Sequence, residues 1–331
     1  MTTLSPQAIA QYWSVRRGVG IADRSAVGRL EMAGADCLDL LQRLTAQEVG
    51  SLEAGQGASV ALVSDKGRVV DATVLYHLGD RLLLLTSPGN QTAVMAWLDR
   101  YTFAEESRVT DITLTTGLVA LSGEQAESLA VRIAGGAILK LPMHHHAAGK
   151  VAGAAVVVAR AREPYGGFHV VVPRREDLPQ VLAGLESQGA VMVSADLYET
   201  LRVEAGMPAH GKEMDERFNP LEARLQPYLN FMKGCYIGQE VVARLDTYQK
   251  VQKLLVSLKL VNGHEVMPGA ALLHEGKDAG FVTSSSYSLA LEAPIALGFV
   301  QTPLATPGTM LAVAPDGALA EVIEMGAPAV R

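Results

Sequence analysis

The sequence predicts an α+β protein in which two fused α/β subdomains precede a small C-terminal antiparallel β-barrel. The chain has 331 residues, a length that favours two or three domains over one. Helix-like and strand-like segments alternate in two runs of similar order before the last third of the chain. After these runs, short strand-like stretches are separated by Gly, Pro, Asn and Asp, a pattern typical of a small barrel.

The first run predicts a helix, a three-stranded meander and a second helix. Leu38, Leu41 and Leu44 recur at helical spacing, after the turn signal Gly34-Ala35-Asp36. A turn-forming tetrapeptide at 65–68 separates the first two strands, which should therefore pair as a hairpin. The expected strands are 58–64, 69–77 and 81–87, and the second helix is 90–101.

The second run repeats strand and helix signals without a clean residue-level repeat. It is expected to end in a helix over 195–205, which Ser194 would cap and Gly206 would terminate. An ordered loop over 207–231 and a short helix over 239–245 should follow. The other expected strands are 110–122, 151–160 and 168–173, and the other expected helices are 123–133 and 176–188.

Near residue 250 the mixed helix and strand signals give way to short strand-like runs, and this change predicts a domain boundary. We expect one domain over 1–250, with a break between its subdomains near 105–110, and a barrel domain over 251–331. The expected barrel strands are 252–260, 270–274, 280–286, 295–300, 310–313 and 318–323.

Composition excludes several classes of function. Apolar residues make up 49% of the chain, enough for a sizeable core, and the net charge of −7 disfavours direct binding to nucleic acid. Cys37 and Cys235 are too few for a disulfide scaffold or a thiolate zinc site, and they suit a reducing compartment. The longest apolar run, 151–159, is about half of a membrane span, and no signal peptide is evident. We expect a cytoplasmic protein without a membrane partner.

The most informative segment is Lys233-Gly234-Cys235-Tyr236-Ile237-Gly238-Gln239-Glu240. Cys235 should lie just before a helix N-terminus and beside the cation Lys233, and both features stabilise a thiolate. The alternative is a buried, inert cysteine in a turn bounded by glycines. Spacing alone does not choose between them.

Two acids and a histidine run are ambiguous from spacing. Glu204 falls near the C-terminal turn of its helix, where a carboxylate needs a partner, either Arg202 or a ligand with two adjacent N–H donors. Asp71 follows a turn in an apolar strand, and a solvent-facing position is the default. The run 144–146 is read as a solvated loop, because adjacent histidines in a regular element do not converge on one metal ion. We find no phosphate-binding loop and no nucleophile elbow.

Several blocks resemble one family in order and spacing. KGCYIGQEVVAR at 233–244 resembles the signature of the YgfZ family of folate-binding proteins, relatives of the glycine-cleavage T-protein that include a mitochondrial iron–sulfur assembly factor. GIADRS at 20–25, MAGADCLDLLQRLTAQEV at 32–49, SDKGRVVD at 64–71 and LRVEAGMPAHGKEMDERFNPLEARL at 201–225 are similar to blocks of the whole superfamily.

This resemblance implies two subdomains and a barrel around a central tetrahydrofolate cleft. Glu204 matches the acid that reads the amino and ring N–H edge of the pterin in T-proteins, and Asp71 falls at or beside the acid near the reacting nitrogens. T-proteins commonly carry two adjacent acids there, whereas this chain has Val70 before Asp71. That departure puts aminomethyl transfer in doubt, but not folate binding.

Cys235 separates the two functions that the resemblance leaves open. The first is a folate-binding accessory protein without classical turnover, which supports iron–sulfur enzymes and affects tRNA modification only indirectly. Cys235 would be its working residue and Lys233 would keep the thiol partly ionised. Other candidates order the loop or contact folate: Tyr236, Gln239, Arg202 and Arg244. The partners would be folate and iron–sulfur client proteins, and the protein would be a monomer. No metal site is expected in the chain itself, and the other ligands of any cluster that it contacts would come from a partner or a small thiol.

The second function is a tetrahydrofolate-dependent aminomethyltransferase or demethylase. Asp71 would then orient or protonate the reacting nitrogen, and Glu204 would hold the pterin. A thiol has no evident task in such a transfer, and the presence of Cys235 therefore favours the accessory role.

Overall fold

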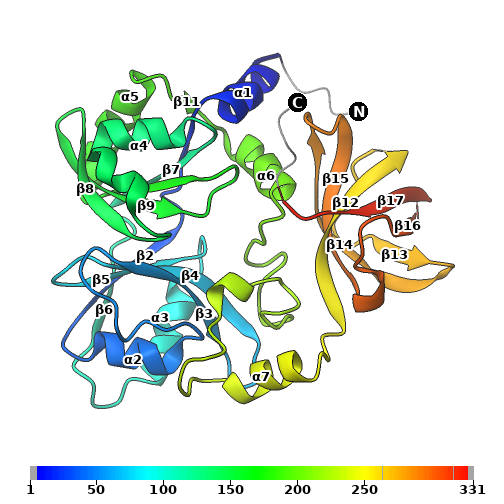
Figure 1. Ribbon diagram of the computed structural model, residues 1–331, viewed down its shortest axis with the longest axis horizontal. Coiled ribbons are helices and arrows are strands. Elements are labelled where there is room, and N and C mark those ends of the chain that lie inside the picture. The colour runs from blue at the N-terminus through cyan, green and yellow to red at the C-terminus, as the bar shows by residue number, and fades with distance from the viewer. Residues whose placement is uncertain (1–5, 263, 316, 327–331) are drawn as a thin grey trace.

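The computed structural model describes residues 6–262, 264–315 and 317–326, and its strands form two sheets and a closed barrel (Figure 1). The two sheets lie one above the other on one side of the molecule, and the barrel lies on the opposite side. Helix α6 (Ala195–Glu204) lies between the upper sheet and the barrel. The predicted fold class is confirmed.

One sheet has the order β3-β4-β5-β2-β6 and contains the predicted meander. Its apolar face is covered by α2 (Cys37–Leu44) and α3 (Gln91–Arg100), which bury apolar side chains at helical spacing against it. Both predicted helices of the first run are therefore confirmed. The strands are β2 (Gly28–Ala33), β3 (Gly57–Val63), β4 (Val69–His77), β5 (Leu82–Thr86) and β6 (Arg108–Asp111).

The other sheet has the order β11-β1-β7-β10-β9-β8 and packs against helices α4 (Ala126–Ala134) and α5 (Leu178–Glu186). Helix α1 (Pro6–Arg17) leads into its strand β1. The strands are β1 (Gly20–Asp23), β7 (Gly117–Ser122), β8 (His146–Val151), β9 (Ala154–Ala161), β10 (Gly167–Val172) and β11 (Val191–Met192).

The chain crosses from one sheet to the other twice, between β1 and β2 and again between β6 and β7. The single strand predicted over 110–122 was wrong, because β6 ends at Asp111 in one sheet and β7 begins at Gly117 in the other. The fully buried Arg29 stabilises this crossing, since its guanidinium donates to the backbone carbonyl of Val27 and to the Thr116 hydroxyl. A hydrophobic pattern does not reveal such a change of sheet.

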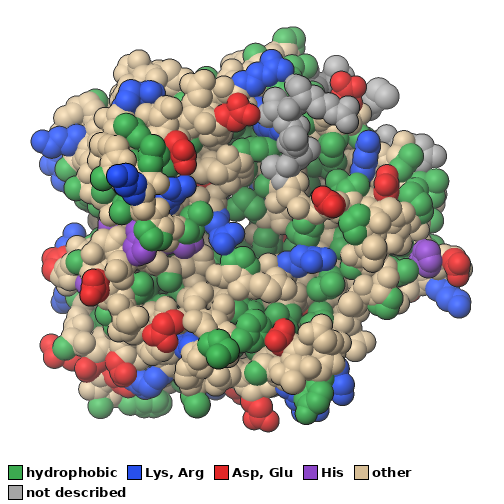
Figure 2. Space-filling view, viewed as in Figure 1, with side chains coloured by type: hydrophobic (Ala, Val, Ile, Leu, Met, Phe, Trp, Pro, Cys, Tyr) green, Lys and Arg blue, Asp and Glu red, His purple; other side chains and the backbone are tan. Residues whose placement is uncertain are grey.

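The histidine run is not a solvated loop. His144 is 4% exposed, and its Nε2 lies 2.5 Å from the Ser59 hydroxyl of the other sheet. His146 begins β8 and packs edge-on against Tyr76. Burial lowers the pKa of His144 to about 3 and that of His146 to about 4. We call His144, His146, Ser59 and Tyr76 the histidine seam; Figure 2 shows histidines gathered where the two sheet units meet.

The barrel closes in the order β12-β15-β14-β13-β16-β17, as its short strands predicted. Small and branched residues such as Val256, Leu272 and Ala320 fill its interior. The strands are β12 (Lys253–Asn262), β13 (Ala271–His274), β14 (Lys277–Ser288), β15 (Ala293–Gln301), β16 (Met310–Ala314) and β17 (Ala318–Ile323).

Helix α6 and the segment after it join the sheets to the barrel. Ser194 caps α6 by accepting a hydrogen bond from the Leu197 amide, and Gly206 follows the helix with a φ of +66°. The irregular segment after Gly206 then reaches α7 (Gln239–Thr247), which ends shortly before β12. Over the described ranges, no helix combines the length and the apolar character needed to cross a membrane.

Candidate functional site

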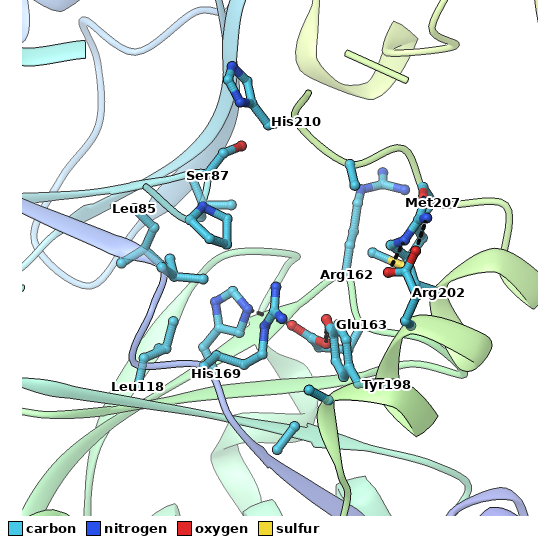
Figure 3. A pocket seen from close by; sticks show the side chains of 18 of the residues that line it. Leu85, Ser87, Leu118, Arg162, Glu163, His169, Tyr198, Arg202, Met207 and His210 are labelled. Carbon is cyan, nitrogen blue, oxygen red and sulfur yellow. Dashed lines mark hydrogen bonds and ion pairs between the residues drawn. The ribbon is translucent and has the colours of Figure 1, made fainter. Parts of the chain in front are cut away.

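A cavity of about 600 Å³ lies between the two sheets, helix α6 and the segment that follows α6. This volume is within the range of small-molecule sites, roughly 300–1,000 Å³. Figure 3 shows side chains from both sheets and from α6 that meet around it.

Glu163 provides a carboxylate in the cavity wall. It is 8% exposed and lies in the turn between β9 and β10. The Tyr198 hydroxyl donates to Oε2 at 2.7 Å, and Oε1 lies 2.8 Å from His169 Nε2 (Figure 3). His169 Nδ1 lies 2.8 Å from the buried Tyr76 hydroxyl, so the imidazole is held at both nitrogens. A carboxylate has about four lone-pair positions, and Glu163 therefore keeps acceptor capacity for a ligand.

Two arginines give the cavity positive charge. Arg24 lies over the Tyr198 ring at 4.1 Å, and Arg162 lines the same cavity. Neither guanidinium forms an ion pair with any residue in the described ranges. Because a guanidinium fork matches a carboxylate or phosphate, these side chains suit an anionic part of a ligand.

Strand β4 presents apolar groups to the cavity. Ala72 and Val74 line it, the neighbouring strand β5 adds Leu85, and β7 of the other sheet adds Leu118. Side chains alternate along a strand, so Asp71 faces away from the surface that carries Ala72 and Val74. The cavity wall is therefore polar at Glu163 and aliphatic along β4.

Asp71 is completely buried, so the default of a solvent-facing acid was wrong. Its carboxylate accepts hydrogen bonds from the Ser87 amide and hydroxyl, the Asn90 side chain and the Ala72 amide, at 2.6–3.0 Å. Burial raises the pKa of Asp71, and the hydrogen bonds from Ser87 and Asn90 oppose that rise. These contacts hold the start of α3 against β4.

Glu204 does not line the central cavity. Its carboxylate accepts hydrogen bonds from the hydroxyls of Tyr12, at 2.8 Å, and Tyr165, and it lies 3.8 Å from the buried Arg16 guanidinium. Burial and the neighbouring carboxylate raise the pKa of Tyr12 and the pKa of Tyr165. Glu204 therefore joins α6 to α1 and to the β9–β10 turn, and it lines a separate crevice against the barrel.

Arg202 uses its five N–H donors within the protein. It binds Glu199 through two of them, and the carbonyl of Met207, Glu213 and the Ser284 hydroxyl through the others. These partners lie on α6, the following loop and β14. A guanidinium has five N–H groups, so Arg202 has none left for a folate tail in this arrangement.

Cys235 is exposed, and its segment lies outside the cavity lining. The Lys233 ammonium is buried and donates at 2.7 Å to the carbonyls of Gln42, Thr45 and Gln47, rather than facing the thiol as expected. Burial lowers the pKa of Lys233 to about 8, against an opposing effect of Glu48. The structure thus brings Lys233 and Cys235 together in one loop but separates both from Asp71 and Glu204.

The remaining predicted residues also lie around this loop. Tyr236 packs on a cluster that contains Val242 and Tyr228, and burial raises its pKa to about 12. Gln239 begins α7, with its side-chain amide 3.5 Å from the Lys233 carbonyl, and Arg244 is exposed on the same helix. Tyr228 lines the cavity, so one apolar cluster touches both regions.

The sequence reading missed the cavity residues Arg24, Arg162, Glu163, His169 and Tyr198. Arg24 was noted only as part of the GIADRS block at 20–25, although it lines the cavity. The others lie in the β9–β10 turn, in β10 or in α6, without a spacing signal. Tyr198 and Glu199 precede Arg202 on α6, and this proximity to the LRVEAG block is the available hint. No cluster of metal-binding side chains occurs among the residues with described positions.

Comparisons with known proteins agree with this architecture. Residues 2–233 match the GCVT N-terminal domain, and residues 253–328 match the glycine cleavage T-protein C-terminal barrel domain. The chain is 31% identical to an aminomethyltransferase of Synechococcus sp. (strain CC9902), covering 92% of this chain and 86% of that protein. It is 29% identical to the putative transferase At1g60990, chloroplastic, of Arabidopsis thaliana, covering 92% of this chain and 71% of that protein.

A solved structure gives the same fold. The glycine cleavage system aminomethyltransferase T from Bartonella henselae superposes with a TM-score of 0.82 at 22% identity, over 96% of this chain and 88% of that one. This likeness concerns the fold, whereas the two family matches, which cover most of the sequence, and the relative at 31% identity show the family. The chain belongs to the glycine cleavage T-protein family.

Proposed function

We propose that the protein binds tetrahydrofolate in the central cavity and supports iron–sulfur enzymes as an accessory protein, with Cys235 as its working residue. In this proposal it acts as a monomer in the cytoplasm, without transferase turnover of its own. Its effect on tRNA modification is indirect, through iron–sulfur client enzymes.

The cavity residues fit tetrahydrofolate at three points. The Glu163 carboxylate is available to the amino and ring N–H edge of a pterin, the role that the sequence suggested for Glu204. Val74 and Leu85 offer an aliphatic surface to a flat ring. Arg24 and Arg162 suit the carboxylates of the glutamate tail, in place of Arg202 and Arg244. Tetrahydrofolate, when bound, supplies ring nitrogens that carry one-carbon units.

The position of Asp71 is the observation that favours an accessory role over transferase chemistry. Transfer chemistry on folate needs an acid beside the reacting nitrogens, and β4 offers Ala72 and Val74 to the cavity instead. Asp71 is buried beneath the wall with its oxygens bound by four donor groups. The β4 wall of the cavity therefore presents no acid to a pterin, and this supports an accessory role over proton transfer from Asp71.

The iron–sulfur part of the proposal rests on the motif and on the accessibility of Cys235. KGCYIGQEVVAR at 233–244 resembles the YgfZ signature, and the Cys235 thiol is exposed. An exposed thiol is able to meet a partner protein, whereas Cys37 is buried at the start of α2. One cysteine does not hold a cluster, so the other ligands belong to the client protein or to a small thiol.

A second candidate is a folate-dependent aminomethyltransferase, since several relatives carry that name. Incubation of the pure protein with tetrahydrofolate and an aminomethyl donor distinguishes the two. Formation of methylene-tetrahydrofolate that survives Cys235→Ala and is lost in Asp71→Asn would favour the transferase.

Calorimetry with tetrahydrofolate, combined with an iron–sulfur enzyme assay in cells, tests the accessory role. We expect Glu163→Gln to weaken folate binding at least tenfold, because a charged acceptor is lost from the cavity. Glu186→Gln, an exposed carboxylate on α5, is the matched control. Cys235→Ala should bind folate like the wild type and fail to support the enzyme. Normal enzyme activity with Cys235→Ala would overturn the role of the thiol.

A further inference from the structure

Lys233 is fastened to the C-terminal end of a helix. The carbonyls that accept its hydrogen bonds belong to Gln42 in the last turn of α2 and to Thr45 and Gln47 just after it. The end of a helix leaves carbonyls without intrahelical partners, and it carries partial negative charge. A buried ammonium with three protons satisfies these carbonyls and is stabilised by them.

Two backbone contacts fasten the same loop to the same place. The Asn230 amide donates to the Ala46 carbonyl at 2.7 Å, and the Ile237 amide donates to the Arg43 carbonyl at 3.2 Å. Lys233 lies between these two points in the sequence, and Cys235 lies between Lys233 and Ile237. The thiol therefore lies in a short loop whose ends are hydrogen-bonded to the last turn of α2 and to the residues just after it.

Gly238, just after this loop, packs closely against the end of β3. It has a φ of +78°, and a Cβ at this position would lie 2.3 Å from the Ser64 carbonyl oxygen. A glycine is therefore required for the chain to approach the β3–β4 turn and begin α7.

We infer that Lys233 is a positioning residue, whose ammonium holds the Cys235 loop on the end of α2 and so fixes where the thiol stands on the surface. This inference rests on the proposed function for its purpose, since Cys235 is the working residue there. It assigns Lys233 a role different from ionising the thiol: the three carbonyls engage the three ammonium protons, leaving none to hydrogen-bond a thiolate.

The charged groups around Lys233 are consistent with this role. Glu48 lies in the turn after α2 and is itself bound by the Gln42 side chain. Arg43 on α2 pairs with Asp39 and Glu105. On the loop itself, the Tyr236 ring lies 5.5 Å from the ammonium. Carbonyl oxygens are thus the direct partners of Lys233, and the carboxylates nearby have other contacts.

The mobility of a nitroxide spin label on Cys235 tests the inference. The full chain carries Cys37→Ala so that one thiol is labelled, and position 233 is Lys, Arg, Gln or Met. We expect a slow label in the wild type and a several-fold shorter rotational correlation time in Lys233→Met. Lys233→Gln should be intermediate, and Lys233→Arg should restore slow motion in part. Lys250→Met, which removes an exposed ammonium after α7, should change nothing.

The pH profile of Cys235 alkylation by iodoacetamide separates positioning from ionisation. If Lys233 positions the loop, Lys233→Met keeps the midpoint of the profile within about 0.3 pH units of the wild type, a difference of about 0.4 kcal/mol. A midpoint that rises by a full unit would overturn the inference and make Lys233 the cation that polarises the thiol. An equally slow spin label in Lys233→Met and the wild type would also overturn it.

A measurement on the unaltered side chain covers the case in which Lys233→Met does not fold. Lysine ammonium protons that are buried and hydrogen-bonded exchange slowly, so a ¹H–¹⁵N spectrum of the wild type should contain a protected NH₃⁺ signal that is absent in Lys233→Arg. Absence of that signal from the wild type would overturn the inference. None of the three measurements needs folate or a client enzyme, so failure here is distinct from failure of the proposed function.

Discussion

Glu204 and Glu163 are both buried carboxylates that accept a hydrogen bond from a tyrosine, yet they face different parts of the molecule. Glu204 binds Tyr12 and Tyr165 beside Arg16, in the joint between α1 and α6. Glu163 binds Tyr198 and lies beside His169, in the wall of the central cavity. The comparison teaches that a conspicuous acid in a family-like block belongs to the framework, while a carboxylate in an unremarkable turn lines the central cavity.

The largest expected effect is the loss of stability in Glu204→Ala. Glu204→Ala removes the carboxylate that holds Tyr12, Tyr165 and Arg16, and breaking a buried charged pair costs about 3–5 kcal/mol. Urea unfolding should show this loss of stability, while the folded fraction still binds tetrahydrofolate normally. Glu163→Ala should lose less stability than Glu204→Ala, but it should bind folate more weakly than the wild type. If Glu204→Ala abolishes binding at full stability, the two carboxylates have exchanged roles.

Asp71 should behave like Glu204 rather than Glu163. Asp71→Ala leaves donors from Ser87, Asn90 and Ala72 without an acceptor, and we expect a loss of about 2–3 kcal/mol in the free energy of unfolding. Asp80→Ala, an exposed acid in the turn before β5, should stay within about 0.5 kcal/mol. An Asp71→Ala protein as stable as the Asp80→Ala control would contradict the framework role.

Acid should weaken the histidine seam that joins the two sheets beside the cavity. The pKa of His144 is lowered to about 3 in the folded protein from an unfolded value near 6.5, and that of His146 to about 4. The unfolded chain therefore takes up protons first, and stability falls as the pH drops below about 6.5, by up to about 1.4 kcal/mol per pH unit for each histidine. Asp71, whose pKa is raised, contributes in the opposite direction.

Urea midpoints measured between pH 7 and pH 4.5 check this expectation. His144→Asn should reduce the slope of stability against pH, even though it also loses the contact with Ser59. His274→Asn, on β13 of the barrel, should leave the slope as it is in the wild type. An unchanged slope in His144→Asn would show that the seam does not govern acid sensitivity.

The smallest expected effect is at Cys235. Cys235→Ser changes an exposed side chain and should alter the free energy of unfolding by less than about 0.5 kcal/mol. Cys37→Ser replaces a buried sulfur at the first position of α2, which packs in the core and lies 3.3 Å from the Ser107 hydroxyl, and the loss of packing should cost more. Thermal unfolding of the two variants gives the comparison. Similar losses in both would mean that the Cys235 loop is part of the folded core.

Local patterns were sufficient for most elements of this protein. The meander, the Ser194 cap and the barrel strands follow from alternation, turn residues and capping chemistry, which act over a few neighbouring residues. The family-like blocks also led to the fold class and to the superfamily, because their order and spacing are properties of the sequence. Helix α1 and the change of sheet after β6 were missed, since neither has a distinct periodic pattern.

The site depended on tertiary structure. Sequence reading placed the Lys233 ammonium beside the Cys235 thiol, but the direction of the ammonium depends on carbonyls nearly two hundred positions away. Likewise, Glu163 becomes a cavity residue through the meeting of the β9–β10 turn with α6. The sequence by itself determined the elements and the family. Packing between distant segments decided that Glu163 lines the central cavity and that Glu204 does not, because burial and hydrogen-bond partners are properties of the assembled fold.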